Sequence, residues 1–199
     1  MSTYGNAHFF ASWAKERLDE MDAALTSFEG KVAEVQADAR DKASKALDGL
    51  RRNRDAFREL VKQQAGANES ALTSAKEKLE AKWSVFEVEV KKYVERYGRQ
   101  FELQQATFKL QSAAQLNAWR DATDKLATAA GEFAVERRSE IEANIKRMKA
   151  DAVVAEEKLL KLNRAGTQSW SAFATALTET RAVFDRANQA AREAFKRAA

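Results

Sequence analysis

Apolar residues recur along this chain in alternating steps of three and four, which is the spacing of a coiled-coil seam. The first stripe begins with Ala14, Leu18, Met21, Leu25 and Phe28. It continues to Val61 and breaks around Gly66, a residue suited to the end of a helix, while Asn68 or Ser70 can cap the next one. The pattern therefore predicts a first helix over about 7–64, followed by a tight turn.

A second apolar stripe follows this turn and has no clear stop before Gly166. It predicts a helix over about 69–163, roughly 140 Å long at a rise of about 1.5 Å per residue. Thr167 or Ser169 can cap a last helix, which we predict over about 168–198. The two outer helices together match the length of the central one.

These three helices predict an all-α fold, an elongated antiparallel coiled coil in which the outer helices fold back onto a very long central helix. The whole chain, 1–199, would form a single elongated domain. In the alternative layout, the central helix bends near Gly131 or Gly98 into a three- or four-helix bundle, because glycine costs about 1 kcal/mol of helix preference. The sequence pattern leaves this alternative open.

Composition supports helices and argues against familiar kinds of active site. The chain has no proline, 7 glycines and 32% charged residues, a composition typical of long solvent-exposed helices. It has no cysteine, and His8 is its one histidine. Catalytic triads, zinc helices with two histidines and thiolate metal sites are therefore incomplete. We expect no catalytic residues, no cofactor and no metal, and hence no enzyme.

The first thirty residues contain no basic segment followed by an apolar one, so a secretory signal is not expected. The longest uncharged stretch, 165–178, is too short and too polar to span a bilayer. These features predict a cytoplasmic protein.

A stretch of low charge, 99–120, combines uncharged polar residues with large apolar ones. Its candidate interface residues are Phe101, Phe108, Leu116 and Trp119. Low charge with embedded aromatic residues is typical of an interface core, so we predict dimerisation or partner docking here. The alternative is an ordinary intramolecular face covered by the first helix.

Charge is divided along the first predicted helix. Residues 1–41 carry a net charge of −4 and residues 42–66 a net charge of +4. The predicted basic tip consists of Arg51, Arg52, Arg54 and Arg58. Such a tip could bind an anionic membrane surface, or the charges could instead set helix pairing. Nucleic acid is a disfavoured partner, because the whole chain carries only +4 and no recognition motif.

The function that these patterns favour is that of a non-enzymatic coiled-coil scaffold. Its aromatic residues outnumber what a two-helix seam can cover, which predicts self-association as a homodimer. An unidentified protein partner would bind along the exposed helix faces. The alternative is a peripheral protein that binds a lipid surface through its basic tip.

Overall fold

The computed structural model describes residues 4–98, 101–165 and 169–199, apart from the side chains at 4, 5, 101 and 137. These residues form six α-helices, one short 3-10 helix and no strand, so the predicted all-α class is confirmed. The helices are α1 (Tyr4–Lys31), α2 (Ala37–Lys62), α3 (Glu69–Tyr97), α4 (Phe101–Ala130), α5 (Val135–Arg164) and α6 (Trp170–Ala198), with the 3-10 helix η1 over Val32–Glu34.

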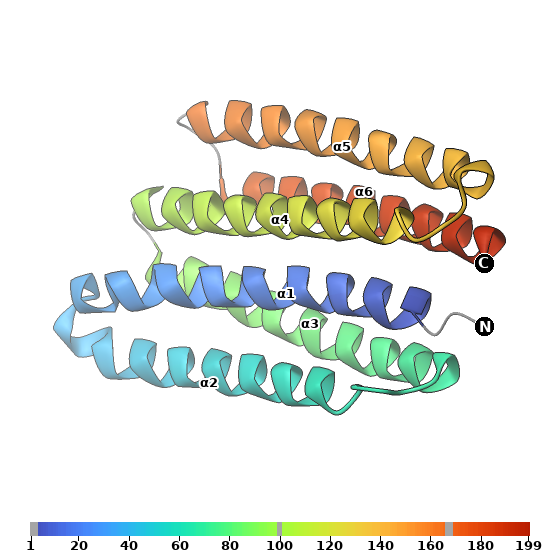
Figure 1. The fold of residues 1–199 in the computed structure, drawn as a ribbon. Helices are drawn as coiled ribbons and strands as arrows, with labels where there is room; N and C mark the ends of the chain where they lie inside the picture. Colours follow the sequence, from blue (N-terminus) through green and yellow to red (C-terminus); the bar gives the residue numbers. More distant parts are fainter. Residues whose placement is uncertain (1–3, 99–100, 166–168) are drawn as a thin grey trace.

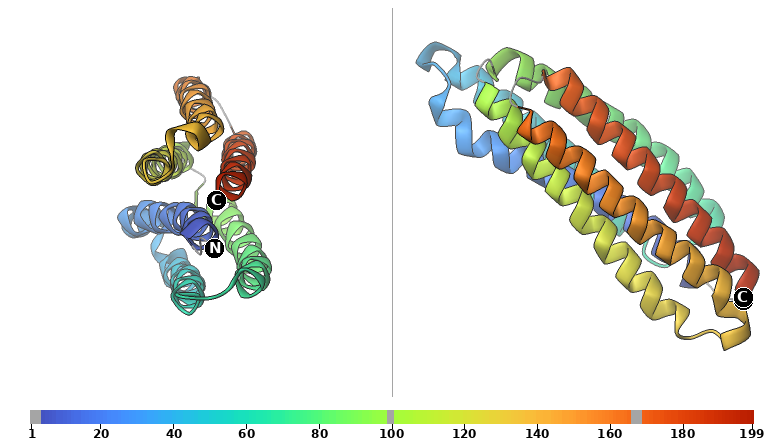
Figure 2. Two further views of the ribbon diagram at one scale, coloured as in Figure 1. Left: turned by 45° about the vertical axis from the view of Figure 1, so that its right-hand side comes forward. Right: turned by 90° about the horizontal axis from the view of Figure 1, so that it is seen from above.

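The six helices lie side by side along one long axis, each antiparallel to the next in the chain (Figure 1). Seen along that axis, they form two groups of three: α1 to α3 in one and α4 to α6 in the other (Figure 2). Helix α1 joins the groups, because it packs against α4 and α6 as well as against α2 and α3. The molecule is therefore a helical bundle with α1 near its centre.

The prediction of a three-helix coiled coil with one long central helix is wrong, because the segment 69–163 forms three helices. The breaks fall at Gly98 and Gly131, the two glycines at which a bend was considered. Gly98 is the residue at which α3 stops, with a backbone conformation outside the helical range (φ −94°, ψ 35°). A Cβ there would lie only 2.6 Å from the carbonyl oxygen of Val94. The longest helices contain 30 residues, about 45 Å rather than 140 Å.

The predicted first helix, 7–64, is also divided. It ends at Lys31, passes through η1 and an extended Val35 (φ −66°, ψ 139°), and resumes as α2. The break contains neither glycine nor proline. Its physical reason is tertiary, because the reversal lays α2 against α1 and buries Phe57, whose ring centroid is 6.3 Å from that of Trp13.

Both predicted reversals are present. Gly66 has φ +79°, a left-handed conformation that favours glycine, and Asn68 caps α3 by accepting the N–H of Ala71 at 2.9 Å. At the second reversal, Ser169 caps α6. The other residues predicted for that turn, 166 and 167, lie outside the described residues.

One continuous core runs through both groups of helices. In the first group, Phe28 stacks on Tyr93 with ring centroids 4.3 Å apart. In the second, Phe108 stacks on Phe173 at the same distance. The aromatic residues of the apolar stripes therefore cover one another within a single chain.

Candidate functional site

The low-charge stretch of α4 faces the inside of the bundle. Three of its four candidate interface residues are buried within the chain: Phe108, Leu116 and Trp119. The side chain of the fourth, Phe101, lies outside the described residues. The structure thus gives this stretch the intramolecular position that was the alternative reading. Its exposed large apolar side chain is Leu110. A docking surface in the folded protein must involve other residues.

The predicted basic tip lies at the contact between α1 and α2. Its members lie in the second half of α2: Arg51, Arg52, Arg54 and Arg58. Arg51 donates to Glu29 of α1 at 2.9 Å, and Asp22 of α1 accepts from both Arg54 and Arg58. The remaining arginine of the set is exposed and has no ion pair among the described residues. Most of this positive charge therefore pairs α2 with α1.

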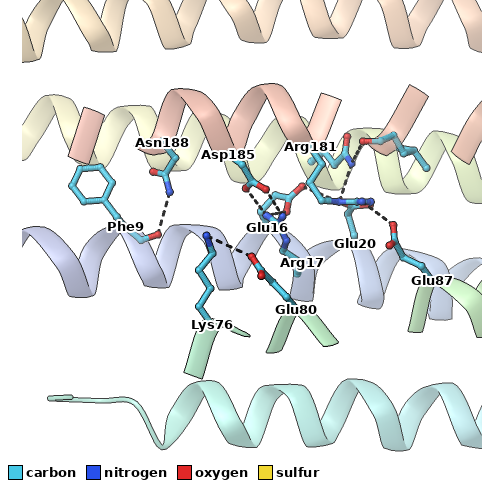
Figure 3. A network of polar contacts seen from close by, with 12 residues as sticks. Phe9, Glu16, Arg17, Glu20, Lys76, Glu80, Glu87, Arg181, Asp185 and Asn188 are labelled. Atoms are coloured by element: carbon cyan, nitrogen blue, oxygen red, sulfur yellow. Dashed lines mark hydrogen bonds and ion pairs between the residues drawn. The ribbon is translucent and has the colours of Figure 1, made fainter. Parts of the chain in front are cut away.

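Buried charged side chains cross the junction between the two groups of helices (Figure 3). Glu20 of α1, fully buried, accepts two hydrogen bonds of 2.9 Å from the guanidinium of Arg181 on α6. Arg181 also donates to Glu87 of α3 at 2.8 Å, and its Cζ lies 4.5 Å from the ring centroid of Trp83. Gln115 of α4 donates to Glu20 at 2.8 Å. This polar junction ties α1 to α3, α4 and α6.

A second ion pair adjoins the first, also shown in Figure 3. Arg17 of α1 forms two hydrogen bonds with Asp185 of α6, at 2.8 and 2.6 Å. It also donates to Glu16 at 2.9 Å, and its Cζ lies 4.8 Å from the ring centroid of Trp13. Two-point binding of a carboxylate by arginine fixes direction as well as distance, so these pairs define how α6 sits on α1.

The pKa values of the two buried carboxyl groups of α1 are shifted in opposite directions. Burial raises the pKa of Glu16 well above its ordinary value, and the opposing charge of Arg17 does not cancel this effect. Burial also acts to raise the pKa of Glu20, but the Arg181 guanidinium outweighs it and lowers that pKa. The Arg181 guanidinium thus favours the ionised form of Glu20, whereas the cations near Glu16 do not offset its burial to the same extent.

The polar junction is closed to solvent. Glu16 is 1% exposed and Glu20 is fully buried, so no substrate can reach either carboxyl group in this conformation. This position favours a structural role in fixing the junction over acid–base catalysis. Buried ionic networks of this kind are associated with specificity of packing more than with net stability.

The sequence pattern did not reveal this network, because Glu16 and Glu20 lie outside the apolar stripe that predicts the first helix. One signal was present: Arg181 falls between Leu177 and Phe184 on the apolar stripe of α6, at a position where the stripe lacks an apolar residue. A charged residue at a seam position indicates a buried ion pair, although not the identity of its partner.

A cleft of about 510 Å³ lies where α1, α3 and α6 meet near the start of the chain. Phe9, Trp13 and Leu72 are among its lining residues, and all three are buried. Its rim is bridged by Arg192 and Glu69, 2.5 Å apart. The cleft therefore offers little free apolar surface.

The outer face of α5 has more exposed apolar surface than this cleft. Seven large apolar side chains are exposed among the described residues, and four of these are on α5: Val135, Val153, Val154 and Leu160. Their exposed fractions range from 44% for Leu160 to 73% for Val135. The end-on view in Figure 2 places α5 at the outer corner of its group, farthest from α2. This helix thus presents apolar side chains to solvent without a covering neighbour on that side.

No protein-family model, curated protein or solved structure matches this chain. Within the described residues, no group of histidine and acidic side chains is arranged to hold a metal ion. None of the described helices is long and apolar enough to cross a bilayer. Functional inference therefore depends on the surfaces of the bundle itself.

Proposed function

We propose that this protein is a non-enzymatic helical scaffold that self-associates through the outer face of α5 and binds a protein partner along its other helices. The observation that carries the proposal is the concentration of exposed apolar side chains on this one peripheral helix. Scattered single apolar residues are normal on protein surfaces, whereas Val153, Val154 and Leu160 lie within about two turns of one helix, and such a local group is typical of an interaction site.

The lipid-surface alternative has less support. It depended on a free basic tip, and three of its four arginines form ion pairs with acidic residues of α1 or α2. An arginine already paired with carboxylates attracts anionic lipid less strongly. Flotation with anionic liposomes distinguishes the two functions, because lipid binding that disappears at high salt would support the alternative.

Self-association can be tested with matched surface variants. V153S/V154S/L160S removes exposed apolar groups from α5, and V85S/V88S removes two comparably exposed valines from α3. We expect light-scattering mass to show association of the wild-type protein and of V85S/V88S, and a monomer for the α5 variant. Equal mass for both variants would remove the support for α5 as the interaction surface.

A further inference from the structure

Helix α5 carries two seams on opposite faces. Its inner seam, which includes Ile141, Ile145, Met148, Ala152, Ala155 and Leu159, is buried in the bundle. Its outer seam consists of Ser139, Ala143, Lys146, Ala150, Val153, Glu157, Leu160 and Arg164, all of them exposed. Successive members of the outer seam are four and three residues apart, and four of the eight are apolar: Ala143, Ala150, Val153 and Leu160. The outer seam thus has the heptad spacing of a coiled coil, with polar layers beside apolar ones.

The outer seam is complementary to itself when reversed. In an antiparallel pair of helices, each residue of one seam faces the residue at the mirrored position of the other. Reversing α5 about a point between 151 and 152 gives four kinds of layer: Ala150 with Val153, Lys146 with Glu157, Ala143 with Leu160, and Ser139 with Arg164. Each layer joins a small side chain to a larger one or a cation to a carboxylate.

We propose that α5 pairs with α5 of a second copy of this chain, antiparallel, around a twofold axis between residues 151 and 152. This inference rests on the proposed self-association and specifies its geometry. Each pair of unlike residues occurs twice in such a dimer, once on either side of the axis. The pairing therefore includes two Lys146–Glu157 contacts between the copies.

Charge favours the antiparallel self-pair over other arrangements. A parallel pair in register would place Lys146 against Lys146 and Glu157 against Glu157, which is repulsive. The antiparallel pair removes both repulsions and replaces them with two Lys146–Glu157 contacts. Charges at and beside a seam commonly determine orientation in coiled coils.

Side-chain size also suits close approach at the axis. Ala143 and Ala150 are the smallest members of the seam, and each meets a large apolar residue of the second copy. Two single helices bury an area near the low end of specific interfaces. We therefore expect a dimer of micromolar affinity that weakens at high salt.

Charge reversal at the Lys146–Glu157 contact tests this geometry by sedimentation equilibrium of the full chain across micromolar concentrations. K146E places a carboxylate against Glu157 of the second copy at both positions, and E157K places an ammonium against Lys146. We expect each to weaken the dimer about tenfold or more. The double variant K146E/E157K restores opposite charges and should return close to wild-type affinity.

A net-charge effect would give a different result. K146E lowers the net charge of the chain and E157K raises it, so a general electrostatic effect would shift affinity in opposite directions. K82E, at an exposed lysine of α3, changes net charge as K146E does and should leave the dimer unchanged. Far-UV circular dichroism checks that every variant is folded.

Cysteine pairing tests the register independently, because the chain has no cysteine of its own. Mixing A150C protein with V153C protein should give a disulfide-linked dimer of the two faster than A150C protein links to itself, since positions 150 and 153 face each other across the axis.

The outcomes separate the inference from the proposed function. If the wild-type protein stays monomeric at all concentrations, both the self-association and its geometry are wrong. If it dimerises but K146E and E157K have no effect, or the double variant does not recover, self-association stands and the α5 pairing is refuted.

Discussion

Replacing Arg181 by methionine is the most direct test of the polar junction. Methionine retains much of the side-chain length but donates no hydrogen bond, so Glu20 loses two bonds of 2.9 Å while it remains fully buried. Gln115 is the neighbour that still donates a hydrogen bond to it. Removing one member of a buried ion pair costs about 3–5 kcal/mol, because the other charge stays buried without compensation. We expect R181M to lower the free energy of unfolding by that amount.

R197M is the matched control on the same helix. Arg197 pairs with Glu140 of α5, but both side chains are more than half exposed. Exposed pairs contribute about 0–1 kcal/mol. For a chain of this length, 1 kcal/mol shifts Tm by about 2–4 °C. R181M should therefore lower Tm by roughly 6–20 °C and R197M by less than about 4 °C, measured by thermal and urea unfolding with circular dichroism.

The dependence on pH supplies a second criterion. Without Arg181, burial raises the pKa of Glu20 above its unfolded value, so the folded variant binds a proton more readily than the unfolded chain. The stability of R181M should then fall as pH rises through the acidic range, and the difference from wild type should be smallest at low pH. Equal losses for R181M and R197M, or a loss independent of pH, would refute the assignment of Glu20 as a buried carboxylate.

Three further tests, two of them with matched controls, concern the turn at Gly66, the core and the raised pKa of Glu16. G66A places a Cβ at φ +79° and should cost about 1 kcal/mol, whereas G49A in the middle of α2 should stabilise by about 0.5–1 kcal/mol, both measured by urea unfolding. F108A should cost about 3–5 kcal/mol, and L110A, an exposed position two residues away, less than about 1 kcal/mol in the same measurement. The raised pKa of Glu16 means that its own contribution to stability falls as pH rises above 4.5. E16Q should therefore gain stability relative to wild type from there towards neutral pH, and a difference independent of pH would contradict the raised pKa.

The reversals after α2 and before α6 were predictable because local chemistry specifies them. Gly66 supplies a left-handed conformation, and Asn68 and Ser169 supply side-chain oxygens for exposed helix N–H groups. The breaks at Gly98 and Gly131 carried a weaker local signal. Glycine lowers helix preference but does not by itself end a helix, so the sequence left a bend there as an alternative.

The break between α1 and α2 had no local signal of this kind, but charge provided one. Net charge changes sign between the acidic first part of the chain and the basic residues that follow. In a straight helix these charges would lie far apart. In the structure, α2 folds back so that Arg51 faces Glu29, and Asp22 faces Arg54 and Arg58. A change in the sign of net charge along one predicted helix therefore predicts that the segment folds back as two antiparallel helices.

The sequence pattern did not reveal the polar junction, because it predicted only one buried stripe for the segment that forms α1. This helix has neighbours on several sides and buries small residues such as Ala24 and Ser27 outside the predicted stripe. Ser27 forms a 2.8 Å hydrogen bond with Thr107 of α4. Small residues on a second face indicate close approach of another helix, and that face also holds Glu20.

The lengths of the helices explain why the sequence favoured a rod. The six helices contain 28, 26, 29, 30, 30 and 29 residues. The predicted helices over 7–64, 69–163 and 168–198 are therefore about two, three and one times the length of one of them. The two outer predicted helices together match the central one in length both in a rod of three long helices and in a bundle of six short ones. The length match therefore does not distinguish the two layouts.

Heptad spacing does not distinguish these cases either, because a seam requires a covering helix beside each turn without specifying where that helix ends. The feature that does distinguish them is the number of large aromatic residues. A two-stranded rod leaves part of each such side chain exposed, and we assigned the excess to a second copy. In the bundle, Trp83 and Trp119 are 5% and 1% exposed within one chain. More aromatic residues than a two-helix seam can cover thus predict a chain that folds back on itself, and a dimer must then be sought on a face such as the outer seam of α5.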